Sequence, residues 1–146
     1  LYQEGALIAK KAREMGMKQP IIGNNGFNSP EYIKQAGAAA DGTMVATPWN
    51  PERQSEKAQA FRKAFIAKYN HEPDQFAAQA YDAMYTIHEA IEKSGTTTDR
   101  KKFRDTLAQI KGFEGATGKF EFDENRDPKM DLDVLIVKNG KWVPLQ

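Results

Sequence analysis

The chain has 146 residues, a formal net charge of +1 and no cysteine. This length is typical of about one ordinary domain, which can bury a substantial core. Basic and acidic residues are interleaved along the predicted helices, a pattern of solvated surface that argues against a nucleic-acid partner. No apolar run approaches the ~20 residues that a membrane-spanning helix needs, and no signal peptide is visible. Because the sequence opens at Leu1 and leads straight into a predicted helix, we expect a processed or truncated chain.

The first third of the chain alternates predicted helices with predicted strands. These elements are a helix over Glu4–Met15, a strand at Ile21–Ile22, a helix over Ser29–Gln35 and a strand over Gly42–Thr47. The two β-branched isoleucines, flanked by proline and glycine, indicate a strand that is buried on both faces. The first helix is amphipathic, with a predicted inward face formed by Ile8, Ala12 and Met15. This alternating order is typical of a parallel sheet.

The pattern changes at Thr47–Pro51, where two prolines exclude a central strand and indicate a crossover or linker. Three consecutive helices are predicted after it: Ser55–Tyr69, Phe76–Lys93 and a helix that Asp99 caps and Gly112 ends. The predicted inward face of the longest helix consists of Ala77, Ala80, Met84, Ile87 and Ile91. Strands are predicted at Lys119–Phe122, Leu132–Val137 and Lys141–Val143, with a turn over 123–128 and a type I′ hairpin turn at Asn139-Gly140.

The segment Gly23-Asn24-Asn25-Gly26-Phe27, called the amide loop below, is the main candidate for a binding site. It follows a predicted strand, and ligands of open α/β sheets bind beyond the carboxyl ends of the strands. Asn24, Asn25 and Phe27 offer hydrogen-bond donors, acceptors and one aromatic face. The alternative is a structural left-handed turn that the asparagines stabilise. Composition alone leaves both interpretations open.

The residues that could serve in catalysis or metal binding have simpler structural explanations. His71 and His88 lack a second ligand at metal spacing, and Ser29, Ser55 and Ser94 lie at helix ends rather than in a nucleophile elbow. The acidic cluster at Asp123, Glu124 and Asp127 lacks the glycine and the distal glutamate of a calcium loop, so we predict a hairpin turn there. The amide loop matches no phosphate-binding motif. We therefore predict no enzyme activity, no metal and no cofactor.

Several longer motifs occur along the chain. They are Ala12–Gly23, Asn28–Glu31, Ala36-Gly37 with Asp41-Gly42, Phe76–Ala83, Gly115–Asp123 and Val137–Val143. In this order and spacing they resemble the leucine/isoleucine/valine-binding family of periplasmic proteins, the substrate-binding proteins of ABC importers. The first motif matches the family pattern Ala-Arg-x-x-Gly-Leu-Lys-x-Pro, followed by two hydrophobic residues and a glycine. The resemblance covers essentially the whole chain.

The resemblance implies an α/β fold of two lobes, the type I periplasmic binding fold with parallel sheets flanked by helices. This chain would be its C-terminal portion only. Residues 1–47 would belong to the second lobe, residues 48–129 to the first lobe, and residues 130–146 to a closing hairpin of the second lobe. The three consecutive helices would then pack on a sheet that lies outside this chain. The missing N-terminal part, or a second copy of the chain, would cover the remaining apolar faces.

The resemblance further implies a non-enzymatic, extracytoplasmic solute-binding component of an ABC transporter. A branched-chain amino acid or related small polar molecule would bind in a cleft between the lobes, and closure would signal to the ABC permease. Asn24, Asn25 and Phe27 would form one wall, with Phe76 and Gln79 on the other. Asn25 occupies a position where relatives that bind amino acids often carry an acidic residue, so a neutral or anionic ligand also stays open. A periplasmic or extracellular location follows, including a lipid-anchored form.

Two other classes of protein are alternatives. A small-molecule sensor domain of the same fold, such as the extracellular part of a signalling receptor, would differ only in sequence beyond this chain. An enzyme with a single flavodoxin-like domain is disfavoured by the three consecutive helices and by the lack of a nucleophile, metal set or phosphate loop.

Overall fold

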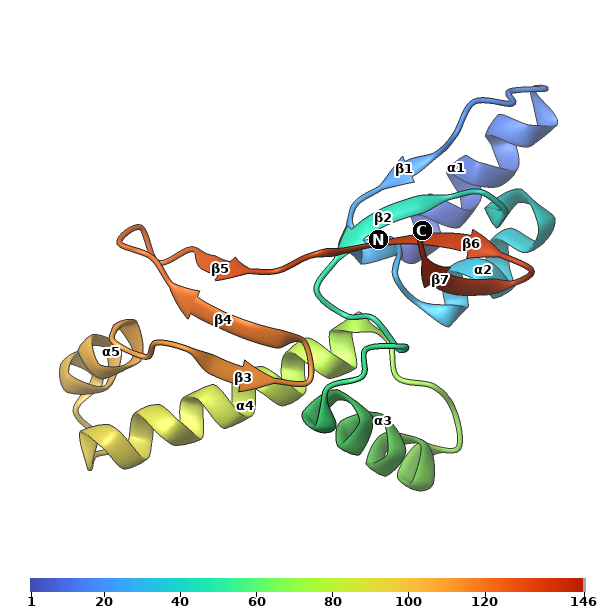
Figure 1. Cartoon of the computed structure of the whole chain (residues 1–146). Coiled ribbons are helices and arrows are strands. Elements are labelled where there is room, and N and C mark those ends of the chain that lie inside the picture. Colours follow the sequence, from blue (N-terminus) through green and yellow to red (C-terminus); the bar gives the residue numbers. More distant parts are fainter. Residues whose placement is uncertain (146) are drawn as a thin grey trace.

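The computed structural model describes residues 1–145 and arranges them in two groups of elements (Figure 1). Group I contains helices α1 (Tyr2–Glu14) and α2 (Pro30–Ala36), the short turns η1 (Asn25–Phe27) and η2 (Gly37–Ala40), and strands β1 (Ile22–Gly23), β2 (Met44–Thr47), β6 (Asp133–Lys138) and β7 (Lys141–Pro144). Group II contains helices α3 (Glu56–Tyr69), α4 (Gln75–Ser94) and α5 (Arg100–Ala108), and strands β3 (Phe113–Gly115), β4 (Gly118–Phe122) and β5 (Pro128–Met130). Two chain segments join the groups, from β2 to α3 and from β5 to β6.

The sheet of group I has the strand order β1-β2-β6-β7. β1 and β2 pair in parallel, which confirms the alternation predicted for the first third of the chain. β6 and β7 are antiparallel additions joined by the predicted hairpin. Asn139 and Gly140 both have positive φ values, 51° and 71°, as a type I′ turn requires. The sheet is therefore mixed, with parallel pairing confined to its first two strands.

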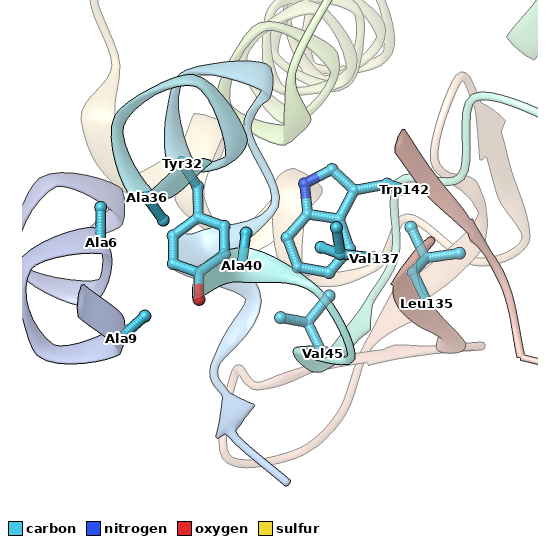
Figure 2. Close-up of a cluster of buried hydrophobic side chains, with 9 residues drawn as sticks. All are labelled: Ala6, Ala9, Tyr32, Ala36, Ala40, Val45, Leu135, Val137 and Trp142. Carbon is cyan, nitrogen blue, oxygen red and sulfur yellow. The ribbon is translucent and has the colours of Figure 1, made fainter. Parts of the chain in front are cut away.

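The core of group I lies between its sheet and helices α1 and α2 (Figure 2). Tyr32 is fully buried there. Its ring stacks on Phe27 at a centroid distance of 5.1 Å and on Trp142 at 5.7 Å. Its hydroxyl forms a 2.8 Å hydrogen bond with Thr43 Oγ1, and burial raises its pKa. One tyrosine thus joins α2, the amide loop and β7.

The predicted inward face of α1 is largely wrong, since only Ala12 of its three residues is half-buried. Ile8 and Met15 are exposed, and the buried residues are Gly5, Ala6 and Ala9. The small side chains let α1 approach α2 and the ring of Phe27 closely, since a Cβ atom on Gly5 would lie only 2.5 Å from that ring. Packing distance, rather than apolar content, decides which face of this helix is buried.

The predicted inward face of α4 is also largely wrong. Its exposed residues include Ala80, Met84 and Ile87, whereas its buried residues are Gln75, Ala78, Asp82, Thr86, Ala90 and Ser94. Similarly, β1 is an edge strand whose Ile22 is 77% exposed, so the prediction of burial on both faces fails. Among residues 1–145, nothing covers these apolar surfaces of α4 and β1. The apolar residues that the sequence pattern predicts to be buried on α4 and β1 therefore have no packing partner within residues 1–145.

Two of the strands in group II were not predicted. β3 and β5 each have three residues and contain a strand-breaking residue, Gly115 and Pro128 respectively. Both lie at the edges of the antiparallel sheet β3-β4-β5, where proline is tolerated. The three consecutive helices are confirmed. No helix within residues 1–145 combines the length and apolar character that crossing a membrane requires.

Candidate ligand-binding site

The amide loop leaves β1 and turns immediately into η1. The side-chain Oδ1 of Asn24 accepts a hydrogen bond from the Gly26 N–H at 2.9 Å, and its backbone oxygen accepts one from the Phe27 N–H at 3.1 Å. Asn24 is extended, with φ −79° and ψ 174°, and no residue of the loop has a positive φ. The loop is thus an Asn-capped 3₁₀ turn, and the left-handed alternative is wrong. The Oδ1 atom of Asn24 is occupied by this cap, whereas its Nδ2 atom forms no hydrogen bond with residues 1–145.

Asn25 differs from its two asparagine neighbours. Asn24 and Asn28 both form side-chain hydrogen bonds, whereas the half-buried amide of Asn25 forms none with residues 1–145. It therefore retains two donors and an acceptor. Its role as a ligand contact stays a prediction.

Phe27 contributes mainly to the core of group I. Its ring stacks on Tyr32 and lies against two glycines, since a Cβ atom on Gly23 would come within 2.3 Å of it and one on Gly5 within 2.5 Å. These contacts fix the loop against α1 and α2. The structure leaves Phe27 half-buried, and its role as a wall for ligand stays a prediction.

The start of α4 lies beside Asn28 and Ser29, which directly follow the amide loop, although α4 belongs to the other group. The Gln75 N–H donates to the Asn28 carbonyl oxygen at 3.4 Å, and the Ser29 hydroxyl donates to Asp74 Oδ2 at 3.4 Å. The ring of Phe76 packs edge-on against Tyr2 of α1, with centroids 6.2 Å apart. The structure thus brings Phe76 to the junction between the groups.

Gln79 lies one helical turn further along α4. It lines a separate cleft of about 300 Å³ between α4 and β4, together with Asp82, Thr86 and Phe120. The structure therefore does not bring the five predicted site residues together: Phe76 lies at the junction of the groups, Gln79 lines this second cleft, and the three loop residues belong to group I. None of the five carries a titratable group. A carboxylate does lie at the start of α4, but it serves as the helix cap, because Asp74 Oδ1 accepts a hydrogen bond from the Ala77 N–H at 2.9 Å.

Asn28 is a structural residue of the site that sequence reasoning overlooked. Its buried Nδ2 donates to Thr47 Oγ1 at 2.9 Å and to the Trp49 carbonyl oxygen at 2.8 Å. It therefore ties the end of the amide loop to the segment that leaves β2 for group II. The only available signal was its place at the start of the Asn28–Glu31 motif.

Asp82 is a second overlooked residue, buried to 2% exposure in the middle of α4. Its carboxylate accepts hydrogen bonds from the Ala116 N–H at 2.7 Å, the Thr117 N–H at 2.8 Å and the Thr117 hydroxyl at 2.6 Å. These bonds hold the β3–β4 turn against α4. They give a structural reason for two of the sequence motifs, Phe76–Ala83 and Gly115–Asp123.

The residues predicted to be structural behave so where the structure tests them. Asp123 Oδ1 accepts hydrogen bonds from the N–H groups of Asn125 at 2.8 Å and Asp127 at 2.9 Å, which confirms a turn. Ser29, Ser55 and Asp99 cap helices. Within the described part of the chain, no three histidine or acidic side chains gather as metal ligands would.

Comparison with known proteins places the chain in a family. The family model described as periplasmic binding protein matches residues 2–141. The chain belongs to the periplasmic binding protein family. This membership implies an extracytoplasmic location.

Three solved structures of similar proteins support the assignment. A leucine-binding protein of Thermotoga maritima is 34% identical, with a TM-score of 0.90 over 99% of this chain and 41% of its own. The branched-chain amino acid transporter substrate-binding protein of Streptococcus pneumoniae, in complex with isoleucine, is 36% identical, with a TM-score of 0.85 over 97% of this chain and 40% of its own. A solute-binding protein of an ABC transporter from R. palustris, in complex with benzoate, is 26% identical, with a TM-score of 0.83 over 97% of this chain and 39% of its own. The chain thus spans about two fifths of the length of each relative, within a type I periplasmic binding fold.

Proposed function

We propose that this chain forms part of a non-enzymatic solute-binding component of an ABC transporter. The observation that carries the proposal is the contact of group I with the start of α4 in group II, made by Asn28 and Ser29, directly after the amide loop, and by Tyr2 of α1. A solute held at this junction touches both groups, so binding favours the arrangement in which they close. The family membership and the transporter proteins among its relatives support the same function.

The two groups correspond in this proposal to parts of the two lobes. Residues 1–47 and the closing hairpin 130–146 belong to the second lobe, and residues 48–129 belong to the first. The grouping of the elements and the two connecting segments support these bounds to within one residue, since β5 of group II ends at Met130. The rest of each lobe comes from residues outside this chain, and together they form the full-length protein referred to below.

The proposed ligand is a branched-chain amino acid or a related small polar molecule. Asn25 offers an unoccupied amide in the amide loop, and Phe76 offers an aromatic surface at the junction of the groups. Because an amide stands at position 25, this loop gives a ligand ammonium only a neutral hydrogen bond. A carboxylate or neutral ligand is accommodated equally well by this loop, and one relative is in complex with benzoate.

The proposed partners follow from the same assignment. An ABC permease receives the ligand from the closed protein, which is periplasmic or extracellular, with a lipid anchor as one form of attachment. The upstream part of the protein, or a second copy of the chain, covers the apolar surfaces that include Ile22, Met84 and Ile87. Such surfaces otherwise favour association.

The binding role of Asn25 is testable by substitution in the full-length protein. We expect a ligand panel of amino acids and small organic acids to yield at least one thermal shift. Asn25→Ala should then weaken calorimetric affinity for that ligand by about tenfold, the loss expected for one buried polar contact. Gln3→Ala, which removes an exposed amide on α1, is the matched control and should leave affinity unchanged. If Asn25→Ala bound the ligand with unchanged affinity, Asn25 would not be part of the binding site. If no ligand of the panel gave a thermal shift, the proposed function would be contradicted.

A further inference from the structure

The side chain of Arg53 joins the two segments that connect group I with group II. Its Nη2 donates to Asp133 Oδ2 at 2.7 Å and to the Pro48 carbonyl oxygen at 3.4 Å. Pro48 lies directly after β2, and Asp133 is the first residue of β6, paired in register with Thr47. One guanidinium therefore bridges both crossing points of the chain, seen in Figure 1 as the connections from β2 to α3 and from β5 to β6.

Arg53 also contacts the β3–β4 turn of group II. Gly118 has a φ of +99°, and a Cβ atom at this position would lie 3.0 Å from Arg53 Nη1. The guanidinium can sit this close because the residue is glycine. Asp82 holds the neighbouring residues Ala116 and Thr117 against α4. Arg53 is thus in contact with both crossing segments and with a turn fixed to the longest helix.

The environment of this ion pair differs from that of an ordinary surface pair. The side chains of Arg53 and Asp133 are 21% and 37% exposed, and Arg53 Nε is buried without a hydrogen-bond partner in residues 1–145. Arg62 on α3 forms another guanidinium–carboxylate pair with Glu72, in the segment after α3, but these two side chains are more exposed, at 36% and 44%. Partial burial of a charge with an unpaired donor costs free energy, so the position of Arg53 needs an explanation beyond stability.

We infer that Arg53 is a positioning residue of the hinge. It holds the two crossing segments at a fixed spacing against the β3–β4 turn, so that the two groups move about a single axis. This inference rests on the proposed function only in its statement about ligand affinity. The restraint that Arg53 places on the hinge does not depend on a ligand. Because a looser hinge lowers the population of the binding-competent arrangement, removal of Arg53 should weaken every ligand by the same factor and leave ligand preference unchanged.

The hinge role is testable without any ligand. In the full-length protein, spin labels at Lys10→Cys on α1 and Lys102→Cys on α5, both exposed, would report the distance distribution between the groups. We expect Arg53→Gln to broaden this distribution by about twofold relative to the labelled parent, as for a hinge that has lost a restraint. Arg62→Gln is the matched control and should leave the width unchanged. Equal widths for Arg53→Gln and Arg62→Gln would overturn the inference.

Two further variants separate the hinge role from general stability and from the proposed function. Asp133→Asn should broaden the distribution as Arg53→Gln does, and the double variant should be no broader than either single one, because both remove one contact. If Arg53→Gln unfolds, the width of the distance distribution of Asp133→Asn is compared with that of Arg62→Gln instead, and equal widths would overturn the inference. For two ligands of the parent protein, each hinge variant should raise both Kd values by about three- to tenfold with an unchanged ratio. A changed ratio would contradict a hinge role, whereas a parent that binds nothing would contradict the proposed function and leave the distance test decisive.

Discussion

Replacement of Asp82 by alanine should destabilise the full-length protein by about 3–5 kcal/mol, among the largest effects of any single substitution in this chain. The buried carboxylate accepts three hydrogen bonds from Ala116 and Thr117. Its removal leaves two backbone N–H groups and a hydroxyl without their partner in a buried environment, and each such group costs about 1–3 kcal/mol. Urea-induced unfolding, followed by circular dichroism, would measure the loss.

The matched control for this prediction is Asp105→Ala on α5. The Asp105 carboxylate contacts Arg104 and Lys101 at the surface, and the hydrogen bond from Arg104 lowers its pKa. Solvent screens such pairs, so we expect no measurable change in the unfolding midpoint. Comparable midpoints for the Asp82 and Asp105 variants would show that the β3–β4 turn does not depend on the Asp82 carboxylate.

Replacement of Tyr32 by alanine should cost about 3–5 kcal/mol, because it empties the centre of the group I core. Tyr32 stacks on Phe27 and on Trp142, so the cavity would also remove the support of the amide loop. We therefore expect weaker ligand binding in addition to a lower unfolding midpoint. Thermal unfolding and calorimetry on the same sample would measure both effects.

The conservative variant Tyr32→Phe separates packing from hydrogen bonding. It keeps the ring stack and loses only the hydroxyl contact with Thr43, at a cost of about 1 kcal/mol. Ligand affinity should then remain near that of the parent protein. If phenylalanine and alanine at this position destabilised the protein equally, the stacking of Tyr32 would not be what organises the core.

The elements that depend on local sequence were predictable. The alternation of helix and strand up to Thr47, the crossover after it, the three consecutive helices and the Asn139-Gly140 hairpin are all present. Each rests on a nearby signal: a cap, a breaking proline, a helical period or a pair of residues that tolerate positive φ. Such signals are read within a few residues and need no tertiary partner.

The buried faces of the helices could not be predicted in the same way. On α1 the small residues Gly5 and Ala9 are buried in place of Ile8, because close approach to Phe27 decides the packing. On α4 the buried face contains Asp82, whose carboxylate is satisfied by a turn more than 30 residues away in sequence. Apolar periodicity identifies a face that can be buried, and only long-range contacts determine which face is.

The candidate site shows the same division between features that local sequence predicts and features that depend on long-range contacts. The amide loop is recognisable from its composition and its place after a strand. By contrast, the hydrogen bond of Asn24 to Gly26, the link from Asn28 to Trp49 and the contact of Phe76 with Tyr2 depend on the folded geometry. Sequence reasoning therefore identified the loop, while the structure distinguishes Asn24, which caps a turn, from Asn25, whose amide is unoccupied by residues 1–145.

A crystal structure of the full-length protein with the ligand selected by the thermal-shift panel tests the proposed site most directly. The account predicts ligand density at the junction of the two groups, with a polar ligand atom within about 3.2 Å of the Asn25 side chain and the ligand in contact with Phe76. Ligand density elsewhere, with the Asn25 amide facing solvent or another protein group, would contradict it.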